Sequence, residues 1–157
     1  MKYIITKERL TKQGITDMGD FLEPYPWKWL LHLTFAYGTS YKRKRSAKSP
    51  KKSAPLDNPV TSKGAKKLFK NFMRTLGRGI IYFMVVEWRQ NEDVVHIHAL
   101  LGETSRPIHW KHGKSQIKPY DPTRGARYYI LKYFFTDHFD FAFRMPKKIG
   151  GSKYVTA

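Results

Sequence analysis

Two apolar runs separated by a short polar segment limit the folds open to this chain more than any other feature. Residues 80–89 (IIYFMVVEWR) and 94–101 (VVHIHALL) are rich in β-branched and aromatic side chains, and the QNED segment between them is polar and suited to a tight turn. Such a pair predicts a β-hairpin whose strands are largely buried. The fold must therefore include an antiparallel sheet.

Upstream of this pair, one strand and one helix are predicted. Residues 27–35 (WKWLLHLTF) read as a largely buried strand. From Thr61 or Ser62 onward, apolar residues recur in steps of three and four, which predicts an amphipathic helix with lysines on its exposed face. Ser62 is the predicted N-cap and Gly77 the predicted stop. The residues that carry this spacing are Ala65, Leu68, Phe69, Phe72, Met73 and Leu76.

Downstream of the hairpin, the chain is predicted to form a second helix and a last strand. Residues 123–135 have helical apolar spacing, and residues 139–143 (FDFAF) alternate like a strand that Pro146 ends. The order strand, helix, strand, strand, helix, strand predicts an α+β fold, with an antiparallel sheet and helices packed on one face in the ferredoxin-like, RRM-like βαββαβ arrangement. The β-prone residues 3–6 are a candidate extra edge strand. The 157 residues should form a single domain.

The chain carries a large excess of positive charge. It has 30 Lys and Arg against 12 Asp and Glu, a formal net charge of +18. A cationic surface gains affinity by displacing the counterions of a polyanion, so nucleic acid is the expected partner, ahead of an anionic membrane surface. Residues 38–62 are rich in Lys, Arg, Ser and Pro and are predicted to form a flexible basic loop within the domain. That loop is either simply solvated or grips phosphates.

The sequence points away from membranes and secretion. No apolar stretch approaches the roughly 20 residues that a membrane-spanning helix requires. The N-terminus, MKYIITKERLTKQG, lacks the apolar core and cleavage site of a signal peptide. The chain contains no cysteine, which excludes disulfides and thiolate metal sites. The cytoplasm is the expected location.

Three polar side chains in the predicted hairpin form a candidate metal site. His96 and His98 alternate with apolar residues and therefore share one face of their strand, with Cβ atoms about 7 Å apart. The expected turn sets Glu87 directly opposite His96 on the same face, whereas a slip of one residue would bring Trp88 there instead. Two imidazoles and a carboxylate suit Mn²⁺ or Mg²⁺ in an open, catalytic site. The alternative is a packed, hydrogen-bonded histidine pair without metal.

The second predicted helix carries a candidate nucleophile. Tyr129, Lys132 and Tyr133 fall on one helical face, and Tyr128 points about a third of a turn away. A phenol with a pKa near 10 can attack a phosphate at neutral pH if an ammonium group and a metal-polarised phosphate assist it. The product would be a covalent phosphotyrosine intermediate. The alternative is that these aromatic residues pack into the core.

Taken in order, these segments resemble the three motifs of the HUH endonucleases, in particular the rolling-circle replication initiators (Rep proteins) of plasmids and single-stranded DNA viruses. The matching stretches are LHLTFAYG, VVHIHALLG and IKPYDPTRGARYYILKYF, within residues 29–135. His96-Ile97-His98 matches the His-hydrophobic-His motif. The segment from Tyr129 to Tyr133 matches the motif Tyr, hydrophobic, any residue, Lys, followed in one superfamily by a second Tyr.

The resemblance implies the HUH fold, a divalent Mn²⁺ or Mg²⁺ ion on His96, His98 and Glu87, and cleavage of one DNA strand by Tyr129. The enzyme would keep the 5′ phosphate and leave a 3′ hydroxyl that primes rolling-circle replication. Lys132 would steady the phosphate or the phenolate, and Tyr133 would serve as a second nucleophile if the chain is a two-tyrosine member.

The resemblance also implies the partners. The substrate would be single-stranded DNA at a replication origin, expected to form a hairpin. No G-x-x-x-x-G-K-[ST] phosphate loop occurs, so either a host helicase opens the duplex for a host polymerase, or the chain is the nuclease portion of a longer protein. Aromatic residues such as Trp88 or Trp110 would stack on bases. Thr34 is expected to be structural, and His32, His109, His112 and His138 are not assigned to the metal.

Other functions stay open at this point. A single-tyrosine HUH transposase of an insertion sequence uses the same chemistry, although Lys132 and the KPYDP segment favour a Rep protein. An RRM-like, non-catalytic module would bind single-stranded nucleic acid through strand aromatics, but the expected K/R-G-F/Y-G/A-F-V-x-F/Y segment is missing. A role in coating DNA without cutting it would account for the positive charge. It would not account for the two histidines and the carboxylate that converge in the hairpin.

Overall fold

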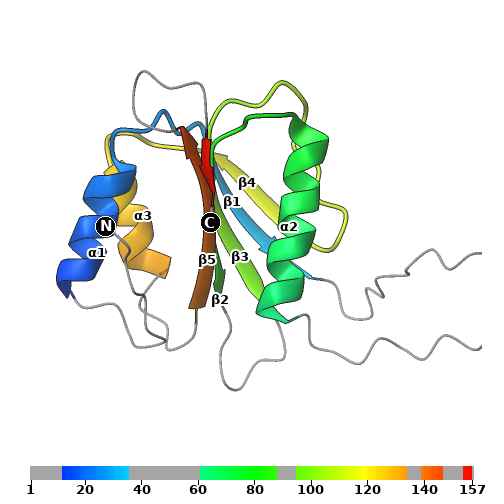
Figure 1. The fold of residues 1–157 in the computed structure, drawn as a ribbon, viewed down its shortest axis with the longest axis horizontal. Helices are drawn as coiled ribbons and strands as arrows, with labels where there is room; N and C mark the ends of the chain where they lie inside the picture. The colour runs from blue at the N-terminus through cyan, green and yellow to red at the C-terminus, as the bar shows by residue number, and fades with distance from the viewer. Residues whose placement is uncertain (1–11, 36–60, 88–94, 134–138, 147–153, 157) are drawn as a thin grey trace, which may run out of the picture.

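The computed structural model describes residues 12–35, 61–87, 95–133, 139–146 and 154–156. Within these residues the chain forms three helices and six strands (Figure 1). The helices are α1 (Lys12–Leu22), α2 (Ser62–Leu76) and α3 (Gly125–Tyr133). The strands are β1 (Trp29–Thr34), β2 (Tyr82–Glu87), β3 (His96–Leu101), β4 (Ser115–Pro119), β5 (Phe139–Pro146) and β6 (Tyr154–Thr156).

The strands form one sheet in the order β4-β1-β3-β2-β5-β6, and each neighbouring pair is antiparallel. The predicted hairpin is confirmed as the pairing of β2 with β3, which lie at the centre of the sheet. The predicted α+β class, an antiparallel sheet with helices packed on it, is also confirmed. The sheet is compatible with a ferredoxin-like core, since β4-β1-β3-β2 have the order 4-1-3-2 when numbered along the chain.

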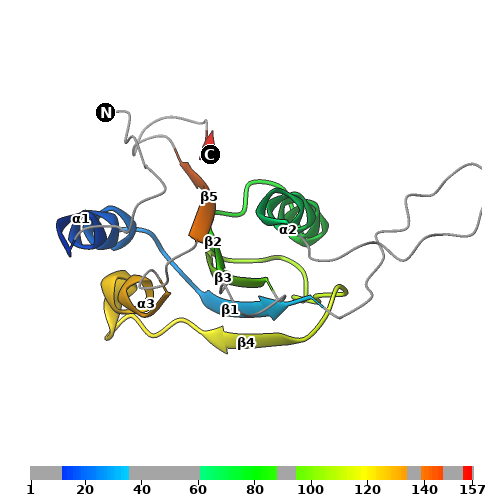
Figure 2. The ribbon, with the colours of Figure 1, turned by 90° about the horizontal axis from the view of Figure 1, so that it is seen from below.

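Helices cover both faces of the sheet, so the expectation that they share one face is wrong. Figures 1 and 2 show α1 and α3 on one side and α2 on the other. The reason lies in the central strands, where consecutive residues are apolar and both alternating sets must be buried. In β2, for example, all six residues are buried. One set packs with α2 and includes Met84 and Ile97, and the other packs with α1 and α3 and includes Phe83 and Val85.

The predicted first helix is confirmed as α2, although its N-cap differs from the prediction. The Thr61 hydroxyl accepts a hydrogen bond from the Gly64 amide at 3.1 Å, so Thr61 is the cap. Ser62, the predicted cap, is already helical and donates to Asp140 in β5 at 2.6 Å. Gly77 ends the helix as predicted, with a φ of 141° that favours glycine.

Three elements were not predicted: α1, β4 and β6. The helix α1 lies against α3, and the approach is so close that a Cβ on Gly19 would stand 2.9 Å from the Arg127 Cβ. The Glu23 carboxylate, just after α1, accepts a hydrogen bond from the Ala126 amide at 2.7 Å in the first turn of α3. The candidate edge strand at residues 3–6 lies outside the described residues, as do residues 38–60 of the predicted basic loop. Ser62, the last residue of that predicted loop, belongs to α2.

Gly19→Ala should destabilise the protein, although the same change at most helical glycines is stabilising. Alanine gains about 1 kcal/mol of helix propensity, but its methyl group would overlap Arg127, and such overpacking costs about 1–3 kcal/mol. Urea unfolding followed by circular dichroism measures the change. Gly64→Ala is the matched control in α2, where the described residues make no such close approach, and it should be neutral or stabilising. A stabilised Gly19→Ala protein would contradict the described packing of α1 on α3.

Candidate metal and tyrosine site

The register of the central hairpin sets the three predicted ligands on one face. Glu87 pairs with His96, as the sequence predicted, and Val85 pairs with His98. Because side chains alternate along a strand, Glu87, His96 and His98 all lie on the face that α1 and α3 cover. Trp88 lies outside the described residues.

The Glu87 carboxylate and the His98 imidazole are hydrogen-bonded to each other. Glu87 Oε2 lies 2.8 Å from His98 Nε2, and each residue is only 8% exposed. A buried carboxylate without a partner would cost several kcal/mol, because it loses its hydration and gains nothing in return. The contact therefore explains how an apolar strand can accommodate Glu87.

The imidazole of His32, which was not assigned to the metal on sequence alone, belongs to the same cluster. His32 in β1 pairs directly with His98 in β3, and their rings stack with centroids 4.5 Å apart at 18°. Its Nε2 atom also lies 3.1 Å from His96 Nδ1. In the sequence His32 lies between Leu31 and Leu33, just as His96 and His98 alternate with apolar residues. The same pattern could therefore have placed His32 on the face of the other two histidines.

The surroundings of His32 keep its ring neutral at pH 7. Burial lowers the pKa of His32 to about 4, and the neighbouring His98 and His96 act in the same direction, while the Glu87 carboxylate opposes them. A neutral imidazole can both donate and accept a hydrogen bond, and a protonated one can only donate. The cluster therefore contains at least one imidazole that remains a hydrogen-bond acceptor through the physiological range.

The chemistry of the donors suits a divalent ion, but the side chains do not converge on one point. Imidazole nitrogens and a carboxylate on one sheet face are a mixed set that Mn²⁺ accepts. Among the described residues, however, no group of three or more His, Cys, Asp or Glu side chains is arranged to hold a metal ion. Glu87 and His98 face each other, and His96 faces His32. A cation would have to replace the contact between Glu87 and His98.

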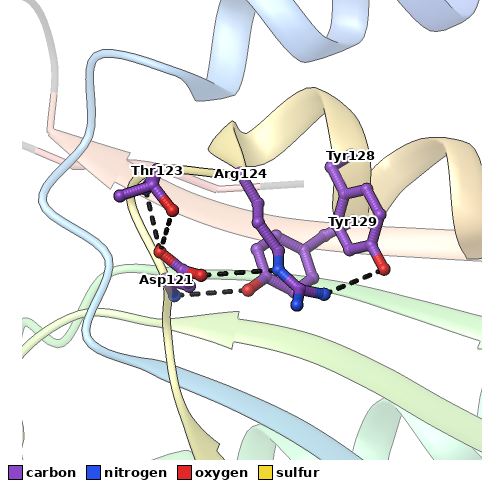
Figure 3. A network of polar contacts seen from close by, with 5 residues as sticks. All are labelled: Asp121, Thr123, Arg124, Tyr128 and Tyr129. Atoms are coloured by element: carbon purple, nitrogen blue, oxygen red, sulfur yellow. Dashed lines mark hydrogen bonds and ion pairs between the residues drawn. The ribbon is translucent and has the colours of Figure 1, made fainter.

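Tyr129 lies on the same side of the sheet as this cluster. It projects from α3 into a buried group of side chains that includes Val85 and Leu100, which stand two residues from Glu87 and His98 on the same strand faces. Tyr129 is 6% exposed, and its hydroxyl oxygen accepts a hydrogen bond from the Asp121 amide at 3.2 Å (Figure 3). The phenol and the imidazoles are thus separated by packed side chains within one layer and not by the sheet.

The start of α3 is held by a compact polar network, shown in Figure 3. The Asp121 carboxylate accepts hydrogen bonds from the Thr123 hydroxyl at 2.6 Å and from the Thr123 amide at 3.0 Å, and these bonds lower its pKa. Arg124 reaches both the Asp121 carboxylate, at 3.4 Å, and the Tyr128 hydroxyl, at 3.1 Å. Its guanidinium lies 5.1 Å from the centre of the Tyr128 ring, which is 40% exposed.

The remaining predicted residues of α3 are placed only in part. Lys132 is exposed in the last turn of the helix. Tyr133 is helical, but its side chain is not among those described. The prediction that Tyr129, Lys132 and Tyr133 act together therefore stays a prediction.

Trp110 is buried and does not lie on a DNA-binding surface, although the sequence had suggested that it would. It is 4% exposed, packs in the core beneath α2 and donates its indole N–H to the Thr34 carbonyl at 2.9 Å. A ring buried on the α2 side cannot stack on DNA bases, so that expectation is wrong. Of the other unassigned histidines, His109 is exposed, His112 contacts the Trp110 ring, and His138 lies outside the described residues.

Comparisons with known proteins do not identify a family. No protein-family model matches the chain, and searches of curated proteins and of solved structures find no significant similarity. In the described part of the chain, no helix combines the length and the apolar character needed to cross a membrane.

His32→Phe should make stability less dependent on pH between about 6.5 and 4. The His32 pKa is lower in the folded state, so the unfolded chain binds a proton in this window while the folded protein does not. The stability associated with neutral His32 is complete above pH 6.5 and is lost as the pH falls towards 4. Because His32 is partly exposed, we expect the free energy of unfolding of the wild type to fall by only about 1–2 kcal/mol across this pH range.

Urea unfolding at pH 7.5, 6 and 4.5 measures this loss. His109→Phe, at an exposed histidine, is the matched control, and its free energy of unfolding should depend on pH as in the wild type. If the free energy of unfolding of His32→Phe depends on pH as strongly as in the wild type, the His32 ring is not shielded from solvent as described.

Proposed function

We propose that this protein is an HUH-type endonuclease that cuts and rejoins single-stranded DNA through a phosphotyrosine intermediate, as the initiators of rolling-circle replication do. One observation carries the proposal: α3, which bears Tyr129, covers the sheet face on which Glu87, His96 and His98 are clustered. A buried carboxylate that is paired with an imidazole thus lies in the same layer of the fold as a buried phenol.

In this proposal Glu87, His96 and His98 hold Mn²⁺ or Mg²⁺. When bound, the ion would supply positive charge that polarises the scissile phosphate. The contact between His98 and Glu87 holds the two side chains together until a cation takes its place. Since His96 and Glu87 are directly paired across the strands, the two ligands keep their spacing as long as the hairpin is intact.

Tyr129 is the proposed nucleophile. Its oxygen attacks the phosphorus of one phosphodiester, the bond from phosphorus to the 3′ oxygen breaks, the 3′ oxygen gains a proton, and the phenolic proton passes to solvent. The Asp121 amide donates a hydrogen bond to this oxygen and holds it near the start of α3. Attack by a 3′ hydroxyl on the phosphotyrosine reverses the reaction and rejoins DNA. Because Tyr129 is nearly buried, DNA must uncover it when it binds.

The surface next to Tyr129 suits a single strand. Tyr128 presents an exposed ring whose position is held by Arg124. An exposed aromatic ring next to a guanidinium can stack on a base and contact the neighbouring phosphate. The net charge of +18 supports a polyanionic partner in general. A replication origin and the host helicase and polymerase remain the proposed biological setting.

The architecture disfavours the RRM-like alternative. An RRM stacks bases on an open sheet face, whereas here α2 covers one face and α1 with α3 covers the other. A transposase of the HUH class would use the same residues as a Rep protein. The two differ in the DNA that they cut, and the oligonucleotides cleaved in the experiment below would distinguish them.

Tyr129→Phe should abolish the covalent adduct while DNA binding is retained. The protein is incubated with a pool of single-stranded oligonucleotides and Mn²⁺, and tyrosine peptides are analysed by mass spectrometry. Removal of the nucleophile should lower adduct formation by about 10³-fold or more, and binding measured by fluorescence anisotropy should change less than about twofold because one hydroxyl contributes little to it.

Tyr82→Phe, which removes a hydroxyl on the α2 side of the sheet, is the control and should keep the adduct. A full adduct in Tyr129→Phe would transfer the role to Tyr133 or Tyr128. The absence of any adduct from the wild type, with folded protein and a varied pool, would contradict the proposal.

His98→Ala should remove cleavage at all Mn²⁺ concentrations that the protein tolerates, because the ion would lose a ligand and Glu87 its partner. Nicking of the preferred oligonucleotide is measured against Mn²⁺ concentration. His109→Ala controls for the general loss of a histidine and should titrate like the wild type. Undiminished cleavage by His98→Ala would exclude His98 as a ligand.

A further inference from the structure

We infer that the exposed side of α2 is a further DNA-binding surface, which holds the phosphate backbone of a duplex. Four cationic side chains of this helix are exposed, and together we call them the α2 ridge: Lys63, Lys67, Lys70 and Arg74. The inference does not depend on the proposed nicking reaction, because α2 and the candidate nucleophile Tyr129 lie on opposite sides of the sheet (Figure 2).

The spacing of the four residues makes the ridge a continuous row. They follow one another at steps of four, three and four residues, so they lie along one stripe of the helix surface. The row is about 16 Å long at a rise of about 1.5 Å per residue, and a DNA duplex of that length carries roughly ten phosphate charges. The ridge can therefore contact several phosphates at once.

Within the described residues, no acidic side chain is paired with the ridge. The helix contains five Lys and Arg residues and no Asp or Glu. The Asp140 carboxylate does contact α2, but it is bound by Lys66 and Ser62, each at 2.6 Å, and neither belongs to the ridge. The helices on the other side of the sheet, α1 and α3, together contain three basic and two acidic residues. Positive charge is thus concentrated on α2.

This row of charge is unfavourable for the helix itself. Like charges three and four residues apart repel one another and lower helix stability. Lys63 also stands in the first turn, where a cation opposes the helix dipole. The helix forms nevertheless, because its apolar side is buried in the core. A bound polyanion would remove the repulsion, so the ridge is better suited to binding than to stability.

The surroundings of the ridge favour a duplex over a single strand. A single strand is held by aromatic rings that stack on its bases. The large apolar side chains that are exposed in the described residues are Phe21 and Tyr128, which belong to α1 and α3. The exposed side of α2 therefore offers charge without a stacking surface. Contacts to phosphates carry no sequence information, so binding to the ridge should be independent of sequence.

Two other polyanions fit α2 less well. A helix that binds an anionic membrane inserts its apolar side between the lipids, whereas the apolar side of α2 is buried against the sheet. The major groove of duplex RNA is deep and too narrow for side chains to enter, whereas that of DNA is about 12 Å wide and admits an α-helix. A DNA duplex is therefore the partner that we infer.

Binding of a blunt DNA duplex of about 20 base pairs, measured by fluorescence anisotropy over a range of salt concentrations, tests the inference. EDTA is present, so metal-dependent cleavage does not contribute. The quadruple variant Lys63→Gln, Lys67→Gln, Lys70→Gln, Arg74→Gln should bind roughly tenfold or more weakly at about 0.15 M salt. The slope of log K against log salt should fall by about 3–4 in magnitude, because each phosphate contact contributes about 0.9.

The matched control removes the same charge outside α2. Four exposed lysines are changed in the variant Lys12→Gln, Lys28→Gln, Lys114→Gln, Lys118→Gln, and the affinity should change less than about threefold. Equal weakening of the two quadruple variants would show that net charge alone binds the duplex, and it would overturn the inference. Circular dichroism confirms that both variants are folded.

Acetylation of lysines in the wild type, read by mass spectrometry, tests the same surface without any substitution. The duplex should protect Lys63, Lys67 and Lys70 and leave Lys12 and Lys28 reactive. Equal protection of all five would overturn the inference, as would tighter binding to phosphatidylserine vesicles or to an RNA duplex of the same length. If the ridge is protected but no tyrosine adduct forms with single strands, the proposed nicking fails and the inference about α2 stands.

Discussion

The pairing of β2 with β3 is the constraint on which the candidate site depends. Because side chains alternate, this register decides which face of the sheet receives each polar group, and it sets Glu87 beside the two histidines of β3. A shift of one residue in one strand would move the carboxylate to the α2 side, among apolar side chains with no imidazole partner. The hairpin register therefore brings Glu87 and His98 into contact, and this contact in turn favours that register. Apolar residues alone would determine the register less well, so the polar cluster adds specificity.

The polar cluster is confined to one layer of a three-layer molecule. The α2 side of the sheet is an apolar core that contains Phe69, Tyr82 and Trp110, and it contributes stability without reaching the predicted ligands. The other side combines aromatic packing with the buried imidazoles, the carboxylate and the Tyr129 phenol. Such a division leaves one side of the sheet as a rigid support, while groups on the other side can rearrange when a cation or a DNA strand binds.

The features that the sequence made predictable are those with strong local signals. The hairpin, its register and α2 follow from runs and spacings of apolar residues, and Glu87 could be placed because the expected turn sets it directly opposite His96. The strand β4 (SQIKP) was missed because an exposed edge strand needs few apolar residues, and α1 because its burial depends on contacts with α3, distant in sequence. His32 was seen as a lone histidine, since only the pairing of β1 with β3 shows that it touches the other two. The burial of Trp110 was not predictable for a similar reason, because nothing near it in sequence reveals the core beneath α2 in which it packs.

The link between α1 and α3 has a mechanical consequence. The Glu23 carboxylate closes the N-terminus of α3 through the Ala126 amide, where its negative charge also complements the helix dipole, and Arg127 reaches back to the Thr16 hydroxyl at 2.8 Å. With Gly19 allowing close contact as well, the first turn of α3 is joined to α1 and to Glu23 just after it. Any motion that exposes the phenol on α3 must then either carry α1 along or break these bonds. The N-terminal helix, remote from the imidazoles in sequence, would thus set how readily the tyrosine is released from its covered position.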